Sequence, residues 1–96
     1  MLERNFQAAL IKKIKKDFPG SMVFKMDPNY IQGTPDLIVL YKKTWAALEV
    51  KKSKHAKHQP NQDYYIRKMN RMSYASFVYP ENKAEVLHEL HKAFRA

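Results

Sequence analysis

The sequence predicts one α/β domain in which helices flank a mixed central sheet. Three observations support this fold class. Segments with helical and strand-like patterns alternate in the order α-β-β-β-α-β-α, which is typical of α/β proteins. The 96 residues suffice for one thin hydrophobic core. The segment "PDLIVLY" is apolar after its acid, as expected of a central strand covered on both faces. Residues 1–96 are therefore expected to form a single domain.

The chain begins with an amphipathic pattern. Apolar residues recur every four positions and predict a helix from Leu2 to Phe18, which Pro19-Gly20 ends. The next segment, Ser21–Met26, predicts a strand. Asp27–Gly33 is rich in turn-forming residues and predicts a loop.

The middle of the chain predicts a β-hairpin. Its strands are Pro35–Tyr41 and Thr44 to Val50 or Lys51, and its turn is Lys42-Lys43. The short turn makes the two strands antiparallel.

The remaining segments complete the α/β order. Lys52–Gln59 is a basic connection, and a helix follows from about Pro60, at its first position, to Met72. Tyr74–Tyr79 predicts a strand, and a last helix runs from Pro80 or Glu81 to about Phe94. A helical crossover places the last strand parallel to the second hairpin strand. The stripe expected to pack against the sheet from the middle helix consists of Tyr64, Tyr65, the aliphatic stem of Lys68, Met69 and Met72.

The composition indicates a partner with many negative charges. The formal net charge is +9 and the pI is about 9.8, which favours DNA, RNA or an anionic membrane surface. A lysine-rich solubilising surface is the alternative, but the lysines cluster at 12–16 and 42–57. No apolar run approaches 18 residues, so no membrane-spanning helix is expected. The first ten residues contain an acid and no apolar stretch, so no secretory signal is expected. Cysteine is absent, which excludes disulfides and thiolate metal sites and fits a reducing compartment.

Two acids and a lysine interrupt the hairpin. Asp36 and Glu49 each lie six residues from the turn, so antiparallel pairing places them roughly opposite one another. Neighbouring carboxylates repel, and a divalent cation between them removes the conflict. Lys51 shares the face of Glu49 and can polarise a phosphate. These are the parts needed for metal-assisted phosphodiester cleavage. The simpler alternatives are a strand-entry role for Asp36 and a surface ion pair between Glu49 and Lys51.

Other polar residues are weaker candidates. On a helical wheel Glu3 points between Leu10 and Ile14, an unusual direction for an acid unless it has a partner. The alternative is a solvated carboxylate that favours the N-terminal end of the helix dipole. Two pairs of histidines spaced by three, at 55 and 58 and at 88 and 91, lack the ligands expected of a structural zinc site.

The motif "TPD" at Thr34–Asp36, followed by "EVK" at Glu49–Lys51, resembles the PD-(D/E)XK nuclease superfamily. Together with an acid on the first helix and "HQPNQ" at His58–Gln62, it is most similar to the virus-type replication-repair nuclease (VRR-NUC) group and to Holliday-junction resolvases. That group has GxPD after a loop, ExK in the next strand and a glutamine opening the following helix. The resemblance covers nearly the whole chain.

The resemblance implies a restriction-endonuclease-like α-β-β-β-α-β core with an added C-terminal helix. It implies that Mg²⁺ or Mn²⁺ is bound by Asp36, Glu49, the backbone carbonyl of Val50 and Glu3. Lys51 would stabilise the pentacovalent charge or orient the water, and Gln62, preferred over Gln59, would steady it. The residues of the connecting loop that could hold DNA phosphates are Lys52, Lys54, His55, Lys57 and His58.

The function predicted on these grounds is a metal-dependent DNA endonuclease that prefers branched or otherwise structured DNA. Two alternatives remain: a non-catalytic nucleic-acid-binding protein on a nuclease fold, and a homing or restriction-type endonuclease. A junction cutter must present two active sites, which predicts a homodimer. The expected location is the cytoplasm, and the resemblance implies a phage or bacterial origin.

Overall fold

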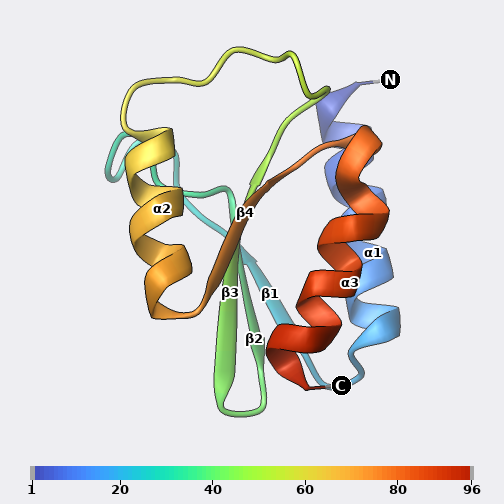
Figure 1. Ribbon diagram of the computed structural model, residues 1–96. Coiled ribbons are helices and arrows are strands. Elements are labelled where there is room, and N and C mark those ends of the chain that lie inside the picture. The colour runs from blue at the N-terminus through green and yellow to red at the C-terminus, as the bar shows by residue number, and fades with distance from the viewer. Residues whose placement is uncertain (1, 96) are drawn as a thin grey trace.

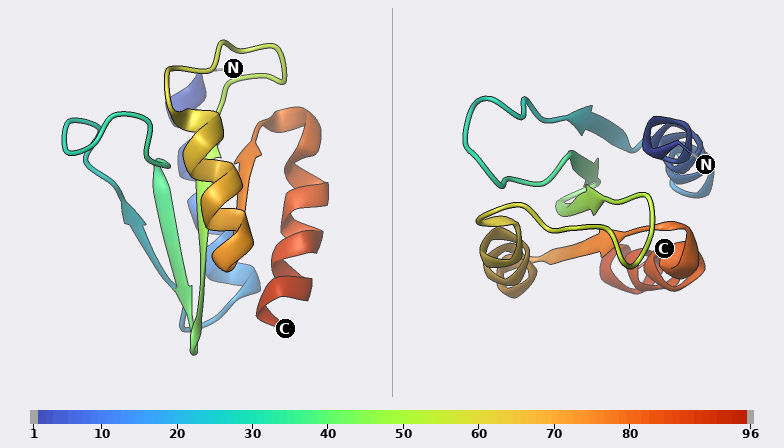
Figure 2. Two further views of the ribbon diagram at one scale, coloured as in Figure 1. Left: turned by 60° about the vertical axis from the view of Figure 1, so that its left-hand side comes forward. Right: turned by 90° about the horizontal axis from the view of Figure 1, so that it is seen from above.

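The computed structural model describes residues 2–95 and has an α/β fold (Figure 1). Four strands form one sheet in the order β1-β2-β3-β4. Helices α1 and α3 lie side by side on one face of the sheet, and α2 lies on the other (Figure 2). The predicted fold class and order of elements are confirmed. The bounds are α1 Glu3–Asp17, β1 Met22–Lys25, β2 Leu37–Tyr41, β3 Thr44–Val50, α2 Gln62–Met72, β4 Tyr74–Val78 and α3 Lys83–Phe94, with a 3-10 turn at Pro80–Asn82 before α3.

The sheet is mixed, as the order of elements predicts. The pairs β1-β2 and β2-β3 are antiparallel, and β3-β4 is parallel across the α2 crossover. The hairpin register runs from Tyr41↔Thr44 to Leu37↔Leu48. Lys42 takes a positive φ of 54°, which the tight turn between β2 and β3 requires. This register is the one that the two-lysine turn predicts.

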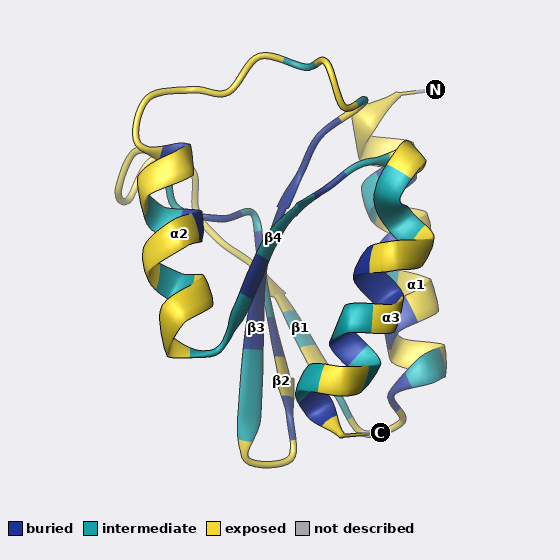
Figure 3. Cartoon of the chain, in the orientation of Figure 1, coloured by how far each residue is buried: buried dark blue, intermediate teal, exposed yellow. Residues whose placement is uncertain are grey.

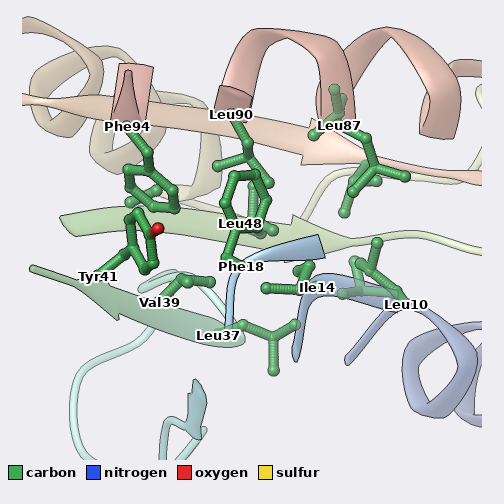
Figure 4. Close-up of a cluster of buried hydrophobic side chains, with 14 of the residues drawn as sticks. Leu10, Ile14, Phe18, Leu37, Val39, Tyr41, Leu48, Leu87, Leu90 and Phe94 are labelled. Atoms are coloured by element: carbon green, nitrogen blue, oxygen red, sulfur yellow. The ribbon is translucent and has the colours of Figure 1, made fainter. Parts of the chain in front are cut away.

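The main core lies between the sheet and the helices α1 and α3. Alternate residues of β2 and β3 point into it, while α1 contributes one residue per turn (Figure 4). Figure 3 shows that the buried faces of α1 and α3 are those turned toward the sheet. The labelled members of this core are Leu10, Ile14, Phe18, Leu37, Val39, Tyr41, Leu48, Leu87, Leu90 and Phe94.

A smaller core lies between the sheet and α2. The small side chains Ala47 and Ala75 pair across β3 and β4 and leave room for the helix. Ile66 and Met69 of α2 pack there. Glu49 lies on this same side of β3, because Leu48 and Val50 point into the main core.

Two expectations about α2 are wrong. The helix begins at Gln62, and Asn61 before it has a φ of 73°, so Pro60 does not occupy the first helical position. Tyr64 and Met72 are 48% and 65% exposed and do not pack in the core. The face of α2 turned toward the sheet instead carries Gln62 and Ile66, one helical turn apart. A glutamine therefore occupies a position where the pattern calls for an apolar residue.

Within residues 2–95, no helix combines the length and the apolar character needed to span a membrane.

Candidate active site

The two hairpin acids and the lysine lie at one end of the sheet. Asp36 immediately precedes β2, and its Oδ2 accepts a hydrogen bond of 2.8 Å from the backbone N–H of Val50. Its backbone carbonyl accepts a 2.7 Å bond from Met26 N–H. Asp36 is thereby fixed to both neighbouring strands, and the register that pairs Leu37 with Leu48 brings it opposite Glu49. The predicted neighbourhood of Asp36 and Glu49 is confirmed.

Glu49 is a buried carboxylate with an incomplete set of partners. Only 4% of the residue is exposed. Its Oε2 accepts a 2.9 Å hydrogen bond from Gln62 Nε2 and lies 3.8 Å from Lys51 Nζ. Its Oε1 is buried and has no hydrogen-bond partner in the described part of the chain. A buried carboxylate oxygen without a donor is costly, so this atom indicates a site for a cation or a proton.

The pKa of Glu49 is raised from 4.5 to about 8, and burial is the largest cause. The negative charge of Asp36, a hydrogen-bonding contact between the two carboxyl groups and the charge of Glu3 contribute to the same rise. Lys51 opposes these effects by favouring the ionised form. In the absence of a metal, the carboxyl group of Glu49 is therefore mostly protonated near neutral pH.

Lys51 is buried and held by fixed acceptors. It is 7% exposed, and its Nζ donates to Gln62 Oε1 at 2.7 Å and to the backbone carbonyl of Lys57 at 3.1 Å. An ammonium group has three donors, so one remains for Glu49 or for a substrate oxygen. The alternative of a surface ion pair does not hold for Glu49 and Lys51, because both residues are buried.

Gln62 joins the acid to the lysine. Its Nε2 donates to Glu49, and its Oε1 accepts from Lys51 and from the backbone N–H of Gln59 at 2.8 Å. Gln59 itself contributes only its backbone to this network, and its side chain is exposed. Of the two glutamines that the sequence left in competition, Gln62 is therefore the one beside the acid and the lysine.

Gly33 places the "GTPD" segment against the start of α2. Its φ is +92°, a conformation that other residues rarely adopt. A Cβ atom at this position would lie 2.7 Å from Pro60 O and 2.7 Å from Asn61 Cβ. Only glycine therefore allows the loop before Asp36 to contact the turn that opens α2.

The donor set fits a hard divalent cation. Asp36, just before β2, and Glu49 of β3 supply two neighbouring carboxylates, and the unpartnered Oε1 of Glu49 is the atom that such an ion would satisfy. Mg²⁺ commonly takes one or two carboxylates and completes its octahedron with water and substrate oxygens. Within residues 2–95, no group of three or more His, Cys, Asp or Glu side chains is arranged to bind a metal ion. An ion held by Asp36 and Glu49 would therefore take its other ligands from backbone carbonyls, water or substrate. The same result gives no support to a zinc site at either histidine pair.

Glu3 is not part of this cluster. It is exposed at the first turn of α1, and Phe6 is the first buried residue of that helix. The expectation that Glu3 faces the core is wrong, since the helix end projects beyond the packed residues. Its charge nevertheless acts on Glu49 at a distance.

The predicted phosphate-binding residues lie on the loop that follows β3, at the same end of the sheet (Figure 3). Their side chains are exposed: Lys52, Lys54, His55, Lys57 and His58. His58 is also engaged within the protein. Its ring stacks on Phe77 at 4.1 Å between centroids, and its Nδ1 lies 2.9 Å from Asp63 Oδ1. The sequence pattern gave no sign of these two partners, which come from β4 and α2.

No protein-family model matches the sequence, and no curated protein is significantly similar to it. The family resemblance therefore rests on the motif residues themselves.

Proposed function

We propose that this protein is a metal-dependent DNA endonuclease of the PD-(D/E)XK superfamily, similar to the VRR-NUC group and with a restriction-endonuclease-like core. The observation that carries the proposal is the buried carboxyl group of Glu49, which has an unpartnered oxygen and lies beside the half-buried Asp36 and the buried Lys51. Such an arrangement destabilises a protein that binds no cation. A binding protein without catalysis would not require it.

The residues have distinct proposed roles. Asp36, Glu49 and the backbone carbonyl of Val50 would hold Mg²⁺ or Mn²⁺, which when bound supplies Lewis-acid stabilisation of a phosphate oxygen. Lys51, held by Gln62 and the Lys57 carbonyl, directs its remaining donor toward the negative charge that develops on the phosphate oxygens, or orients the attacking water. Gln62 positions Lys51 and Glu49 relative to each other.

Further groups fit a polyanionic substrate. The exposed lysines of the 52–58 loop lie beside the carboxylate pair and would contact phosphates, which position DNA without reading its sequence. The net charge of +9 adds long-range attraction. We therefore propose selection of branched or otherwise structured DNA by shape, by a cytoplasmic homodimer with two active sites. Glu3 adds negative charge on the α1 side of the site.

The competing function is a nucleic-acid-binding protein without catalysis. The basic loop alone would serve it, whereas the buried polar network of Glu49, Lys51 and Gln62 would bring it no benefit. A homing or restriction-type endonuclease would need additional elements for base recognition.

Cleavage assays test the proposal. Purified protein is incubated with four-way junction, flap, single-stranded and linear duplex DNA in Mg²⁺, Mn²⁺ or EDTA. We expect cleavage that needs metal and is lost in Lys51→Ala, while Lys43→Ala, a matched lysine change in the hairpin turn, retains it. Tight DNA binding without cleavage in either metal would instead establish the binding protein. Equal cleavage by wild type and Lys51→Ala would remove Lys51 from the mechanism.

A further inference from the structure

A pocket lies beside the carboxylate pair, and Asp36 is one of its lining residues. It has a volume of about 180 Å³ and lies between the 27–33 loop and the start of α2. Asp36 and Gln62 form its inner wall, so it opens directly onto the proposed active site. In Figure 2 the 27–33 loop and the loop before α2 are seen at the same end of the sheet. The roles proposed above use only the inner wall of this pocket.

The lining of the pocket combines apolar side chains with hydrogen-bonding groups. Met26, Pro28 and Pro35 supply the apolar part. Asp27, Gln32 and Gln59 supply donors and acceptors. Among the side-chain hydrogen bonds of residues 2–95, none uses the amide of Gln32 or of Gln59, so both remain available. Planar ligands that display amide-like edges, such as nucleobases, match this combination.

The size of the pocket restricts its ligand. Drug-sized ligands fill pockets of roughly 300–1,000 Å³, so about 180 Å³ suits a single small ring system. It has room for one nucleobase and excludes a base pair. A base that enters must therefore be unpaired, or must leave its partner first.

We propose that the 27–33 pocket receives the base of an unpaired nucleotide next to the phosphate at the Asp36–Glu49 site. This inference rests on the proposed nuclease function and names its substrate class: DNA with an unpaired nucleotide at the cleavage point, as in a flap or at a branch, in preference to continuous duplex. Gln32 and Gln59 contact the edge of the base, while Met26 and Pro28 contact its faces.

The loop that forms the pocket is held in place without a ligand. Thr34 Oγ1 donates to Ile31 O at 3.0 Å, and Asn29 N–H donates to Asp27 Oδ1 at 2.8 Å. Gly33 closes the loop against Pro60 and Asn61. A preformed pocket loses less conformational entropy on binding.

The same loop offers a second surface for unpaired bases. Tyr30 is 76% exposed, more than any other large apolar side chain of residues 2–95, and Ile31 beside it is also exposed. Exposed aromatic rings are common stacking platforms for single-stranded nucleic acids. The exposed lysines after β3 provide charge for the backbone, so loops for bases and for phosphates lie at one end of the sheet.

The test uses a variant that fills the pocket from an exposed position, Gln32→Trp. Its control is Met72→Trp, which adds the same ring to an exposed residue at the other end of α2. One arm measures fluorescence of flap DNA with 2-aminopurine at its first unpaired nucleotide, in EDTA so that no cleavage occurs. The other measures cleavage in Mn²⁺ of flaps with one abasic site placed in turn at each nucleotide around the cut.

We expect the 2-aminopurine signal to change on binding to wild type and Met72→Trp, and not on binding to Gln32→Trp. We expect one abasic position to lower kcat/KM by about 5- to 150-fold, the usual range for one base contact, in wild type and not in Gln32→Trp. If kcat/KM is the same for every abasic flap and is also unchanged in Gln32→Trp, the base-binding role of the pocket is overturned and the nuclease proposal stands. A signal lost only in Gln32→Trp, with no cleavage of any DNA, would support the pocket and overturn the nuclease. Neither signal nor cleavage would overturn both.

Discussion

Replacing Glu49 by glutamine tests whether the negative charge of the buried Glu49 carboxylate destabilises the folded protein. The amide has the shape of a protonated carboxyl group and carries no charge. It can accept the hydrogen bond from Gln62 and donate one to Asp36, which the ionised acid cannot do. We therefore expect Glu49→Gln to be more stable than wild type at neutral pH without metal, although it replaces a proposed metal ligand.

The magnitude follows from the pKa of Glu49. That pKa is 4.5 ordinarily and about 8 in the folded protein, so between these values the folded state holds a proton that the unfolded chain has released. The free energy of unfolding of wild type then falls as pH rises, by about 1.4 kcal/mol per pH unit from this group, and by about 3 kcal/mol from pH 4.5 to pH 7. The contribution is intact below 4.5 and fully lost above 8. Glu49→Gln lacks this loss, so its advantage over wild type grows across the same range.

Urea unfolding followed by circular dichroism, at several pH values between 4 and 9 in EDTA, measures this difference. Glu85→Gln is the control, because Glu85 is an exposed glutamate of α3. The difference in free energy of unfolding between Glu85→Gln and wild type should stay nearly constant with pH. Repeating the series with Mg²⁺ or Mn²⁺ should stabilise wild type by about 2.7 kcal/mol at a hundred times the Kd, and leave Glu49→Gln unchanged.

Two results would refute the reasoning. If Glu49→Gln is less stable than wild type at pH 7 in EDTA, the carboxylate is not strained in the folded protein. If the metal stabilises both proteins equally, it binds elsewhere.

Three further predictions concern the residues that support the site. Gly33→Ala should lower the free energy of unfolding, measured in urea, by more than about 2 kcal/mol, because a Cβ there meets Pro60 O at 2.7 Å. Gly20 has a similar φ but open space around it, so Gly20→Ala should lower the free energy of unfolding by only about 1 kcal/mol. Equal losses in the two variants would exclude the steric contact. Gln62→Leu should destabilise by about 2–4 kcal/mol and reduce cleavage, because it leaves Glu49 and Lys51 each short of a buried partner; unchanged stability would show that water replaces the amide. His58→Ala removes the ring that stacks on Phe77, so it should lower the free energy of unfolding by about 1 kcal/mol and speed amide hydrogen exchange at residues 57–59. Unaltered exchange there would show that the loop is held by other contacts.

Local patterns predicted most of the secondary structure and misjudged α2. Period-two and period-four apolar patterns found the strands and α1, because each of these faces a continuous core. In α2 the position one turn before Ile66 is Gln62, so a polar residue lies where the pattern expects an apolar one. Tyr64 and Met72 were instead assigned to the buried face of the helix, although both are exposed. The start at Gln62 was missed because Asn61, which lies close to Gly33, adopts a left-handed conformation that ends the preceding loop one residue before the helix.

Glu3 illustrates a different limit. A helical wheel gives a direction around the helix axis, and in that direction Glu3 follows the buried stripe. It does not say how far the packed sheet extends along the axis, and burial in α1 begins only at Phe6. The exposure of Glu3 is therefore a property of the packing of α1.

The sequence by itself determined the hairpin register, and with it the pairing of Asp36 with Glu49. Turn length and strand alternation are local, so they fix which residues lie opposite one another. Only the tertiary structure decided that Gln62, 13 and 11 residues beyond Glu49 and Lys51, bridges the two, and that a pocket opens beside them. The same packing raises the pKa of Glu49 to about 8. These features depend on the exclusion of water by elements distant in the chain, and no local pattern encodes that exclusion.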